Sequence, residues 1–380
     1  MGNKILLSIA VPTYNRAKFL KEFFDNLEPQ MVGAGTNIEV CVSNNGSIDN
    51  TRDVVQGFAA KHPGRVRYGE NKENLGFDKN VLKAVDMAQG KYIWTFSDDD
   101  LFNDGALSKV IGLVADLENK DKVIAGVAVK DSAFRRDEKT GRLIKYHSSV
   151  DEVKPPVYQT DFVKIIQGDV PYTGISNLIF NGEFLKKLIK DKPDLVNMGI
   201  GTYYFHSWLY LLLLIFNKEA ECWVINEDLM TVTDTVPKFK FILEDHFELV
   251  YKGNFKFFDN LALVSKGADK KTIAAVKKQR RHANVSLIGM MALFKAYDIP
   301  NFASWAKCVK LSFKYLPFAN ALLVTAMIAG LSIAPPAIVK KTYKALLRRK
   351  YKAKADRIWL DTDTQFNYWN LQEGNRRMTE

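Results

Sequence analysis

Three consecutive carboxylates, Asp98, Asp99 and Asp100, follow an apolar segment of the chain. The β-branched and aromatic residues of that segment, Tyr92–Phe96, predict a buried strand. In open α/β sheets the ligand crevice lies beyond the carboxyl ends of the strands, where these acids fall. Acids packed so closely repel one another unless a cation lies among them, and oxygen ligands favour Mg²⁺ or Mn²⁺. The sequence therefore predicts a divalent-metal site, with an acidic turn that caps the helix near Asp104 as the alternative.

A second polar segment follows the first predicted strand, residues 4–11. It reads PTYNR over residues 12–16 and takes the place of a first strand-to-helix turn. The Gly-x-Gly-x-x-Gly fingerprint of dinucleotide-binding domains is missing there, which argues against a dehydrogenase. Gly33 and Gly35 lead into a strand instead of a helix and predict only a loop.

Strand-like and helix-like segments alternate through the first third of the chain. Strands are predicted over residues 4–11, 38–43, 66–69, 91–97 and 122–130, and helices over residues 16–27, 49–60, 77–88 and 104–117. This alternation is typical of an α/β fold, a parallel sheet with helices on both faces. The pattern is looser afterwards, with strands expected at 174–181 and 221–226 and a buried helix over 203–216.

The composition changes near residue 235. Beyond that point the chain reads mostly as helix, over residues 244–265, 270–297 and 302–315. We therefore expect an α/β domain over residues 1–235, which carries the candidate chemistry, and a helical, basic domain over residues 236–380.

The formal net charge of +11 is concentrated near the C-terminal end of the chain. Residues 340–354 contain only basic charges, which favours binding to an anionic membrane or to nucleic acid. The preceding residues 315–339 are uncharged and long enough to cross a bilayer. Gly330 and the Pro335-Pro336 pair interrupt a single span, however. A segment that lies on the membrane surface is therefore favoured over a transmembrane helix and over a soluble helical core.

The three cysteines, Cys41, Cys222 and Cys308, are isolated from one another and from the histidines. Their spacing fits neither a zinc site nor a disulfide framework and favours a reducing compartment. A strand is predicted within a few residues of Met1, so no signal peptide is expected. Together with the basic segment, this predicts a cytoplasmic protein at the inner face of the cell membrane.

Four motifs occur in a characteristic order: VPTYNR, SNNGSIDNT, NLGFDKN and GKYIWTFSDDD. With these motifs the chain resembles family 2 glycosyltransferases, and within them most the branch of abequosyltransferases and O-antigen sugar transferases. The resemblance covers residues 4–130 well and residues 130–230 loosely. It implies a GT-A fold, Rossmann-like and mostly parallel, and an inverting enzyme that uses a nucleotide sugar.

The resemblance also assigns roles by position. Asp99, with Asp100, would hold Mn²⁺ or Mg²⁺. Residues that would bind the nucleotide sugar lie in all four motifs: Pro12, Thr13, Tyr14, Arg16, Asn44, Asn45, Asp78, Lys79 and Asp98. An ordinary helix start explains Asp78 and Lys79 equally well.

The donor's base stays open because of one departure from the family pattern. Asn44 and Asn45 stand where family members more often have two aspartates. An aspartate only accepts hydrogen bonds, which suits the N3–H of uracil or thymine. An asparagine accepts or donates and suits cytosine as well.

An inverting transferase needs a base that removes the proton of the acceptor hydroxyl. The resemblance points to residues 199–208, which contain no carboxylate, and His206 takes the matching place. An imidazole titrates near neutrality and can act as this base. The alternative is a histidine that is satisfied within a buried helix. Four acids remain competing candidates: Asp169, Asp194, Glu227 and Asp228.

The sequence thus predicts a metal-dependent glycosyltransferase that uses a nucleoside-diphosphate sugar and a lipid-linked saccharide acceptor at a membrane surface, without nucleic acid. One alternative is a nucleotidyltransferase that makes nucleotide sugars, although its usual glycine-rich, arginine-containing loop is missing after the first strand. The other is a non-catalytic membrane-surface or nucleic-acid-binding protein, which the basic segment supports.

Overall fold

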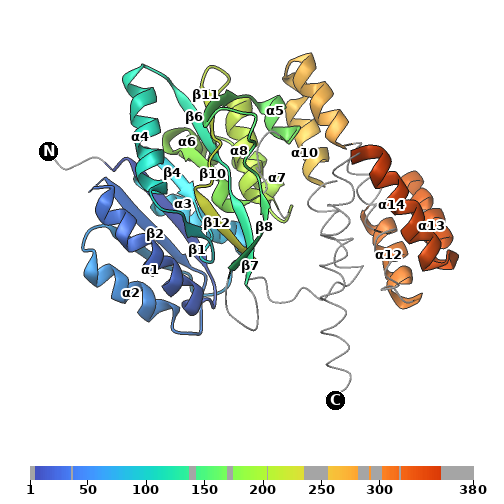
Figure 1. Ribbon diagram of the computed structural model, residues 1–380, viewed down its shortest axis with the longest axis horizontal. Helices are drawn as coiled ribbons and strands as arrows, with labels where there is room; N and C mark the ends of the chain where they lie inside the picture. The colour runs from blue at the N-terminus through green and yellow to red at the C-terminus, as the bar shows by residue number, and fades with distance from the viewer. Residues whose placement is uncertain are drawn as a thin grey trace. The chain divides into compact units, whose positions relative to one another are not determined.

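The computed structural model describes residues 5–35, 37–136, 143–168, 174–202, 204–234, 256–280, 291, 302–315 and 318–351. The chain folds into two compact units. The first comprises Met1–Pro237 and Phe257–Gln279, and the second comprises Lys238–Lys256 and Arg280–Glu380. Each unit is described below by itself (Figure 1).

The first unit is built on an eight-stranded sheet of order β3-β2-β1-β4-β10-β6-β11-β9. Strands β1, β2, β3 and β4 are mutually parallel, and β6 and β11 run the same way, whereas β10 and β9 are antiparallel to their neighbours. The strands span Leu7–Thr13 (β1), Ile38–Asn44 (β2), Val66–Glu70 (β3), Tyr92–Thr95 (β4), Ile124–Val129 (β6), Val157–Thr160 (β9), Leu178–Asn181 (β10) and Glu221–Ile225 (β11). The predicted mostly parallel α/β sheet is confirmed, and the carboxyl ends of its parallel strands share one edge.

Helices cover both faces of this sheet because alternate strand residues point to opposite sides. Ile9 of β1 packs in a core with α1, α2 and α4, whereas its neighbour Ala10 packs in a second core with α3 and α5–α8. The helices span Ala17–Gly33 (α1), Thr51–Lys61 (α2), Phe77–Met87 (α3), Ala106–Asn119 (α4), Phe162–Ile166 (α5), Gly182–Asp191 (α6), Pro193–Gly199 (α7) and Phe205–Phe216 (α8).

A second, four-stranded sheet has the order β5-β12-β7-β8. Its strands span Leu101–Phe102 (β5), Ser132–Arg136 (β7), Leu143–Ser148 (β8) and Met230–Asp234 (β12). Strand β12 runs antiparallel to β5 and parallel to β7, and β7 and β8 form an antiparallel hairpin (Figure 1). Because β5 directly follows Asp100, this sheet begins at the acidic cluster.

The first unit also contains a segment from beyond the predicted boundary at residue 235. The chain leaves this unit after Pro237 and returns over Phe257–Gln279. Phe257 at the start of α10 (Phe257–Val264) is buried, and its ring centroid lies 5.9 Å from that of Trp208 in α8. The expectation that every residue after 235 belongs to a separate helical domain therefore differs from the structure, because these aromatic side chains complete the core beneath α8.

The described part of the second unit contains α12 (Phe302–Tyr315), α13 (Phe318–Ile333) and α14 (Pro336–Tyr351). Helices α12 and α13 pack against each other, with Cys308 and Ala321 fully buried. Across the described residues, no single helix is both long and apolar enough to cross a membrane. The pair Ala321–Ile333 and Pro336–Thr342, bent by 117°, meets those two criteria together.

Candidate active site

The sheet brings the PTYNR segment and the acidic cluster together, because β1 and β4 are adjacent parallel strands. The Thr13 hydroxyl donates a hydrogen bond of 2.6 Å to Asp98 Oδ2. The Nε of Arg16 lies 3.1 Å from Asp98 Oδ1, and its Nη2 forms a close ion pair with Asp99. The Ser97 hydroxyl donates to the other oxygen of Asp99. Two acids and one guanidinium therefore form a charged cluster at the carboxyl edge, which we call the Arg16 cluster.

Burial sets the electrostatics of the Arg16 cluster. It raises the pKa of Asp98 from 3.8 to about 7, and the Arg16 guanidinium opposes this shift by favouring the ionised carboxylate. The carboxylate of Asp98 is almost fully buried, and that of Asp99 is nearly so. The site thus favours a positive charge between the two acids.

The carboxylate of Asp100 forms its hydrogen bonds with groups outside the Arg16 cluster. Its Oδ2 accepts a hydrogen bond of 2.6 Å from the Ser176 hydroxyl, and its Oδ1 accepts one of 3.1 Å from the backbone amide of Thr233 in β12. Burial and the charge of Asp99 raise the pKa of Asp100 to about 8. These contacts tie the start of the small sheet to β12 and to the turn before β10, and the role of Asp100 as a metal ligand stays a prediction.

The predicted metal site can be tested on the donor atoms that are present. Within the described parts of the chain, no group of three or more His, Cys, Asp or Glu residues is arranged to hold a metal ion. Asp98 and Asp99, however, present only oxygen atoms and already hold a cation, the guanidinium of Arg16. This donor set fits a hard divalent ion whose remaining ligands come from a diphosphate.

Asn44 and Asn45 are buried, and their amides bond to protein groups. Asn44 donates to the Tyr68 hydroxyl at 2.9 Å and accepts from the amide of Ser47 at 3.0 Å. Asn45 donates to Asn74 at 2.8 Å, and its Oδ1 accepts from Leu75 N at 2.9 Å. Both asparagines therefore fasten the end of β2 to the neighbouring strand and loops. Direct reading of a nucleobase by either asparagine stays a prediction.

Asn80 holds three neighbouring strand ends together, and the sequence interpretation did not single it out. Its Nδ2 donates to the carbonyl oxygens of Ser43 and Thr13 at 2.9 and 3.3 Å, and its Oδ1 accepts from Ser43 and Asn71 side chains at 2.7 and 3.0 Å. The sequence feature that could have indicated this role is the position of Asn80 in the first turn of α3, three residues after the NLGF segment. Such a residue faces the sheet and can bond to exposed strand termini.

The predicted residues around this framework differ in exposure. Tyr14 is 40% exposed and Phe77 is 51% exposed, so both rings are available to a ligand at this edge. Lys79 is exposed, and Pro12 is buried. The Asp78 carboxylate accepts a hydrogen bond of 2.6 Å from the backbone amide of Gly201.

His206 is buried in the first turn of α8, the helix that follows Gly201 and its turn. That turn is held beside the start of α3 by Asp78, so His206 belongs to the same side of the unit as the NLGFDKN motif. Trp208 fixes α8 against α7 through a hydrogen bond of 2.8 Å to the carbonyl of Leu195. The alternative reading, a structural histidine in a buried helix, is compatible with the same placement.

Among the competing acids that the structure describes, one is exposed and two pair with lysines. Asp194 is exposed in the first turn of α7. Asp228 accepts from Lys145 at 2.9 Å and from Ser132 of the small sheet, and Glu227 pairs with Lys109. Asp169 lies outside the described residues.

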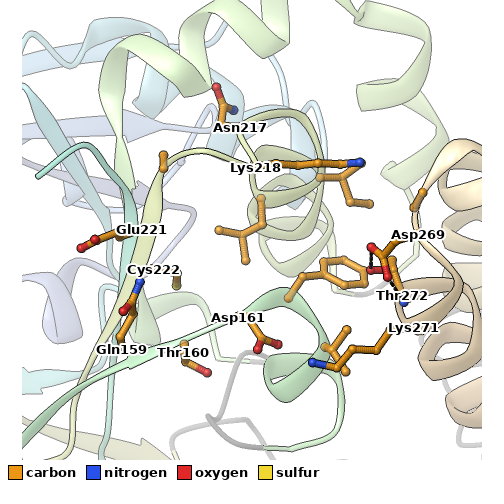
Figure 2. Close-up of a pocket in the computed structure, with 16 residues that line it drawn as sticks. Gln159, Thr160, Asp161, Asn217, Lys218, Glu221, Cys222, Asp269, Lys271 and Thr272 are labelled. Carbon is orange, nitrogen blue, oxygen red and sulfur yellow. Dashed lines mark hydrogen bonds between the residues drawn. The ribbon is translucent and has the colours of Figure 1, made fainter.

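A cavity of about 450 Å³ lies at the β9–β11 end of the sheet, away from the central strands (Figure 2). Its charged residues come from separate parts of the chain and include Asp161, Lys218 and Lys271. Asp161 accepts from the amide of Lys164 at 2.8 Å, and Asp269 accepts from that of Thr272 at 2.9 Å, so both acids cap helices. No predicted site residue lines this cavity.

The sheet order is that of a mostly parallel α/β domain of the GT-A type, with the charged cluster at the carboxyl ends of β1 and β4. Residues 8–190 match the model of glycosyl transferase family 2.

Named relatives are similar to this chain over part of their length. The chain is 30% identical over 225 residues to abequosyltransferase RfbV of Salmonella typhimurium, which covers 57% of this chain and 62% of that protein. It is 27% identical over 195 residues to a chondroitin synthase of Pasteurella multocida, covering 47% of this chain and 19% of that protein. The chain therefore spans about three fifths of the first relative and about a fifth of the second.

Solved structures share the fold. The crystal structure of S. aureus TarS residues 1–349 in complex with UDP-GlcNAc superposes with a TM-score of 0.51 at 16% identity, covering 98% of this chain and 92% of that chain. A second crystal structure of S. aureus TarS residues 1–349 gives a TM-score of 0.50 with the same coverage. At this identity the likeness concerns the fold.

Proposed function

We propose that this protein transfers a sugar, with inversion, from a nucleoside-diphosphate sugar to an acceptor hydroxyl in the assembly of a cell-surface polysaccharide. The observation that carries the proposal is the Arg16 cluster, in which β1 and β4 bring two acids and a guanidinium to the edge where α/β folds bind ligands. The activities named for abequosyltransferase RfbV and for the chondroitin synthase support it.

In this proposal the donor nucleotide lies over the carboxyl ends of β1 and β2. Tyr14 and Phe77 offer exposed rings that can stack on a base or a sugar. Asn45 bonds to the segments that carry both rings, through Thr13 O at 2.9 Å and the loop before α3. The asparagine framework thus positions the aromatic groups, and the UDP-GlcNAc in the TarS complex supports a nucleotide sugar as donor.

Asp99, with Asp98 beside it, would hold Mn²⁺ or Mg²⁺ together with the diphosphate. When bound, such an ion neutralises the departing nucleoside diphosphate. Arg16 supplies a further positive charge at the same place, and Thr13 fixes the orientation of Asp98. These groups stabilise the leaving group without forming a covalent intermediate.

His206 is our candidate for the base that accepts the proton of the acceptor hydroxyl. In this proposal the base approaches from the side opposite the departing phosphate, and the Asp78–Gly201 hydrogen bond holds the turn before α8 beside α3. A direct, single displacement from that side gives inversion at the anomeric carbon.

The second unit would dock on the inner face of the cell membrane, where a lipid-linked saccharide is the acceptor. Helix α13 carries exposed apolar side chains, and the second turn of α14 carries basic ones. The residues that support this role are Phe318, Leu322, Leu323, Ile333 and Ile338 on the apolar side and Lys340 and Lys341 on the basic side. An amphipathic surface of this composition binds anionic bilayers without crossing them.

A screen of nucleotide sugars with Mn²⁺ tests the proposed function. We expect release of a free nucleoside diphosphate from one donor, by transfer or by slow hydrolysis, and none from the Asp99→Asn variant. Formation of a nucleotide sugar from a nucleoside triphosphate and a sugar phosphate, with pyrophosphate release, would show a nucleotidyltransferase instead. If no donor is consumed and none binds, the proposed function fails.

A further inference from the structure

The Arg16 guanidinium stands where a divalent ion would have to bind. Its Nε and Nη2 lie against one oxygen each of Asp98 and Asp99. The other oxygen of Asp98 accepts from Thr13, and that of Asp99 accepts from Ser97. Protein donors thus contact all four carboxylate oxygens, and two of these oxygens are held by a single cation.

A metal ion can reach Asp99 Oδ2 only if Arg16 moves away. The backbone beside Arg16 is fixed, because the amide of Asn15 donates to the Ser47 hydroxyl and Asn15 accepts from the amide of Ile48, both at 2.8 Å. The guanidinium itself is less confined: the side chain is 28% exposed, and its Cζ lies 4.7 Å from the centroid of the Phe19 ring. Arg16 can therefore leave Asp99 by a change of side-chain rotamer, while its backbone stays in place.

We propose that Arg16 is the counter-cation of the donor-free site and exchanges places with the metal when the nucleotide sugar arrives. In the donor-free protein Arg16 pairs with both Asp98 and Asp99 and disfavours the metal alone. In the donor complex the metal takes Asp99, and the released guanidinium turns to the diphosphate. A divalent ion brings two positive charges and a diphosphate two negative ones, so the exchange leaves the net charge of the site unchanged.

The exchange rests on the proposed function and makes metal and donor binding cooperative. Either ligand alone would break the ion pairs of Arg16 and leave one side without a partner. The metal alone leaves the guanidinium without an anion, and the nucleotide alone leaves the carboxylates without a cation. Together they supply a cation for Asp99 and an anion for Arg16. Coupling between two ligands typically amounts to about 5–150-fold in affinity.

The test is a calorimetric or EPR titration of the full-length protein with Mn²⁺ alone, and then with Mn²⁺ in the presence of UDP, CDP, GDP or dTDP. For the wild type we expect weak binding of Mn²⁺ alone and at least about tenfold tighter binding with the nucleotide that binds best. Arg16→Gln should bind Mn²⁺ alone about tenfold more tightly than the wild type and gain less from the nucleotide. At saturating Mn²⁺ it should bind the nucleotide more weakly.

Lys21→Gln is the matched control, since it removes one positive charge from an exposed pair with Asp25 in the same helix. It should behave as the wild type does. If Arg16→Gln does not fold, as judged by circular dichroism, Arg16→Lys replaces it, because a single ammonium cannot span both carboxylates in the same way. That variant should also bind Mn²⁺ alone more tightly than the wild type.

Two results separate this proposal from the proposed function. In the first, the nucleotide tightens Mn²⁺ binding to the wild type, but without nucleotide the Arg16 variant binds Mn²⁺ no more tightly than the wild type does. This result overturns the exchange and leaves the proposed transferase activity intact. Unchanged nucleotide affinity of the variant at saturating Mn²⁺ overturns it as well. A wild type that binds no Mn²⁺ even with every nucleotide overturns both the proposed metal dependence and the exchange.

Discussion

The carboxylate of Asp78 accepts a hydrogen bond of 2.6 Å from the backbone amide of Gly201, 123 residues further along the chain. Asp78 lies in the first turn of α3, at the edge where β1 and β2 end. Gly201 has a φ of 74°, a left-handed conformation that favours glycine, and it precedes the helix of His206. This bond connects the proposed donor side of the site to the proposed base.

We expect Asp78→Ala to lower turnover more than donor affinity. The change leaves the amide of Gly201 without its acceptor, at a cost of about 1–3 kcal/mol, and lets the turn before α8 move. Turnover should fall about tenfold or more, while the KM for the donor changes little. Asp78→Asn keeps an oxygen acceptor and should retain most of the activity. A rise in KM alone, in both variants, would instead indicate direct contact between Asp78 and the donor.

His206→Ala tests the proposed base. Loss of a general base typically lowers turnover by about 10²–10⁴-fold, because the proton moves in the transition state. Donor binding, measured by calorimetry, should stay close to that of the wild type. Asp194→Asn is the comparison, since Asp194 is exposed in α7 and should have little effect. Wild-type turnover of His206→Ala, with a large loss for Asp194→Asn, would reassign the base.

Asp100 makes the stability of the metal-free protein depend on pH. Burial raises its pKa from 3.8 to about 8, so the folded state favours the protonated acid. The stabilisation is therefore fully present below pH 3.8 and is lost as the pH rises toward 8.

Asp100→Asn should remove this dependence, because the amide can still accept from Thr233 and can donate to Ser176. We expect the free energy of unfolding of the variant to exceed that of the wild type by an increasing amount between pH 5 and pH 8, on the order of a few kcal/mol at the upper end. Urea unfolding in EDTA measures this difference. The exposed Asp86→Asn provides the control. A difference that shrinks as the pH rises would contradict the assigned shift.

The proposed membrane contact can be tested without truncating the chain. Lys340→Glu combined with Lys341→Glu reverses two charges at the start of α14. Each basic residue near an anionic surface contributes about 1 kcal/mol, so the double variant should float with anionic vesicles at least about tenfold less than the wild type. Vesicles of neutral lipid should not distinguish the two proteins. Equal flotation of both proteins with anionic vesicles would remove the electrostatic part of the proposal.

The sequence could predict the main sheet because its strands and helices alternate with clear periods, and because the motifs fall at strand ends. It could not predict the small sheet. Strand β5 has only two residues, β7 is the polar segment SAFRR, and β12 pairs with partners far away in the chain. Strands this short acquire their structure from tertiary pairing.

The sequence indicated which segments meet at the candidate site but not which residues contact one another. Motif order indicated that the PTYNR segment and the acidic cluster share an edge, yet nothing in their spacing tells that Arg16 spans Asp98 and Asp99. Nor does it tell that Asp100 turns to Ser176 and Thr233, since those donors come from segments more than 70 residues away. The return of Phe257–Gln279 to the first unit is equally non-local, because it depends on the aromatic surface of α8.

The most direct test of the account is the metal dependence of Asp99→Ala. Donor turnover is measured across a Mn²⁺ titration and in EDTA, with the exposed Asp116→Asn variant of α4 as the control. We predict that the wild type and the control require Mn²⁺ or Mg²⁺, and that Asp99→Ala loses at least about a hundredfold in turnover at saturating metal. Full activity of Asp99→Ala in EDTA would contradict the account.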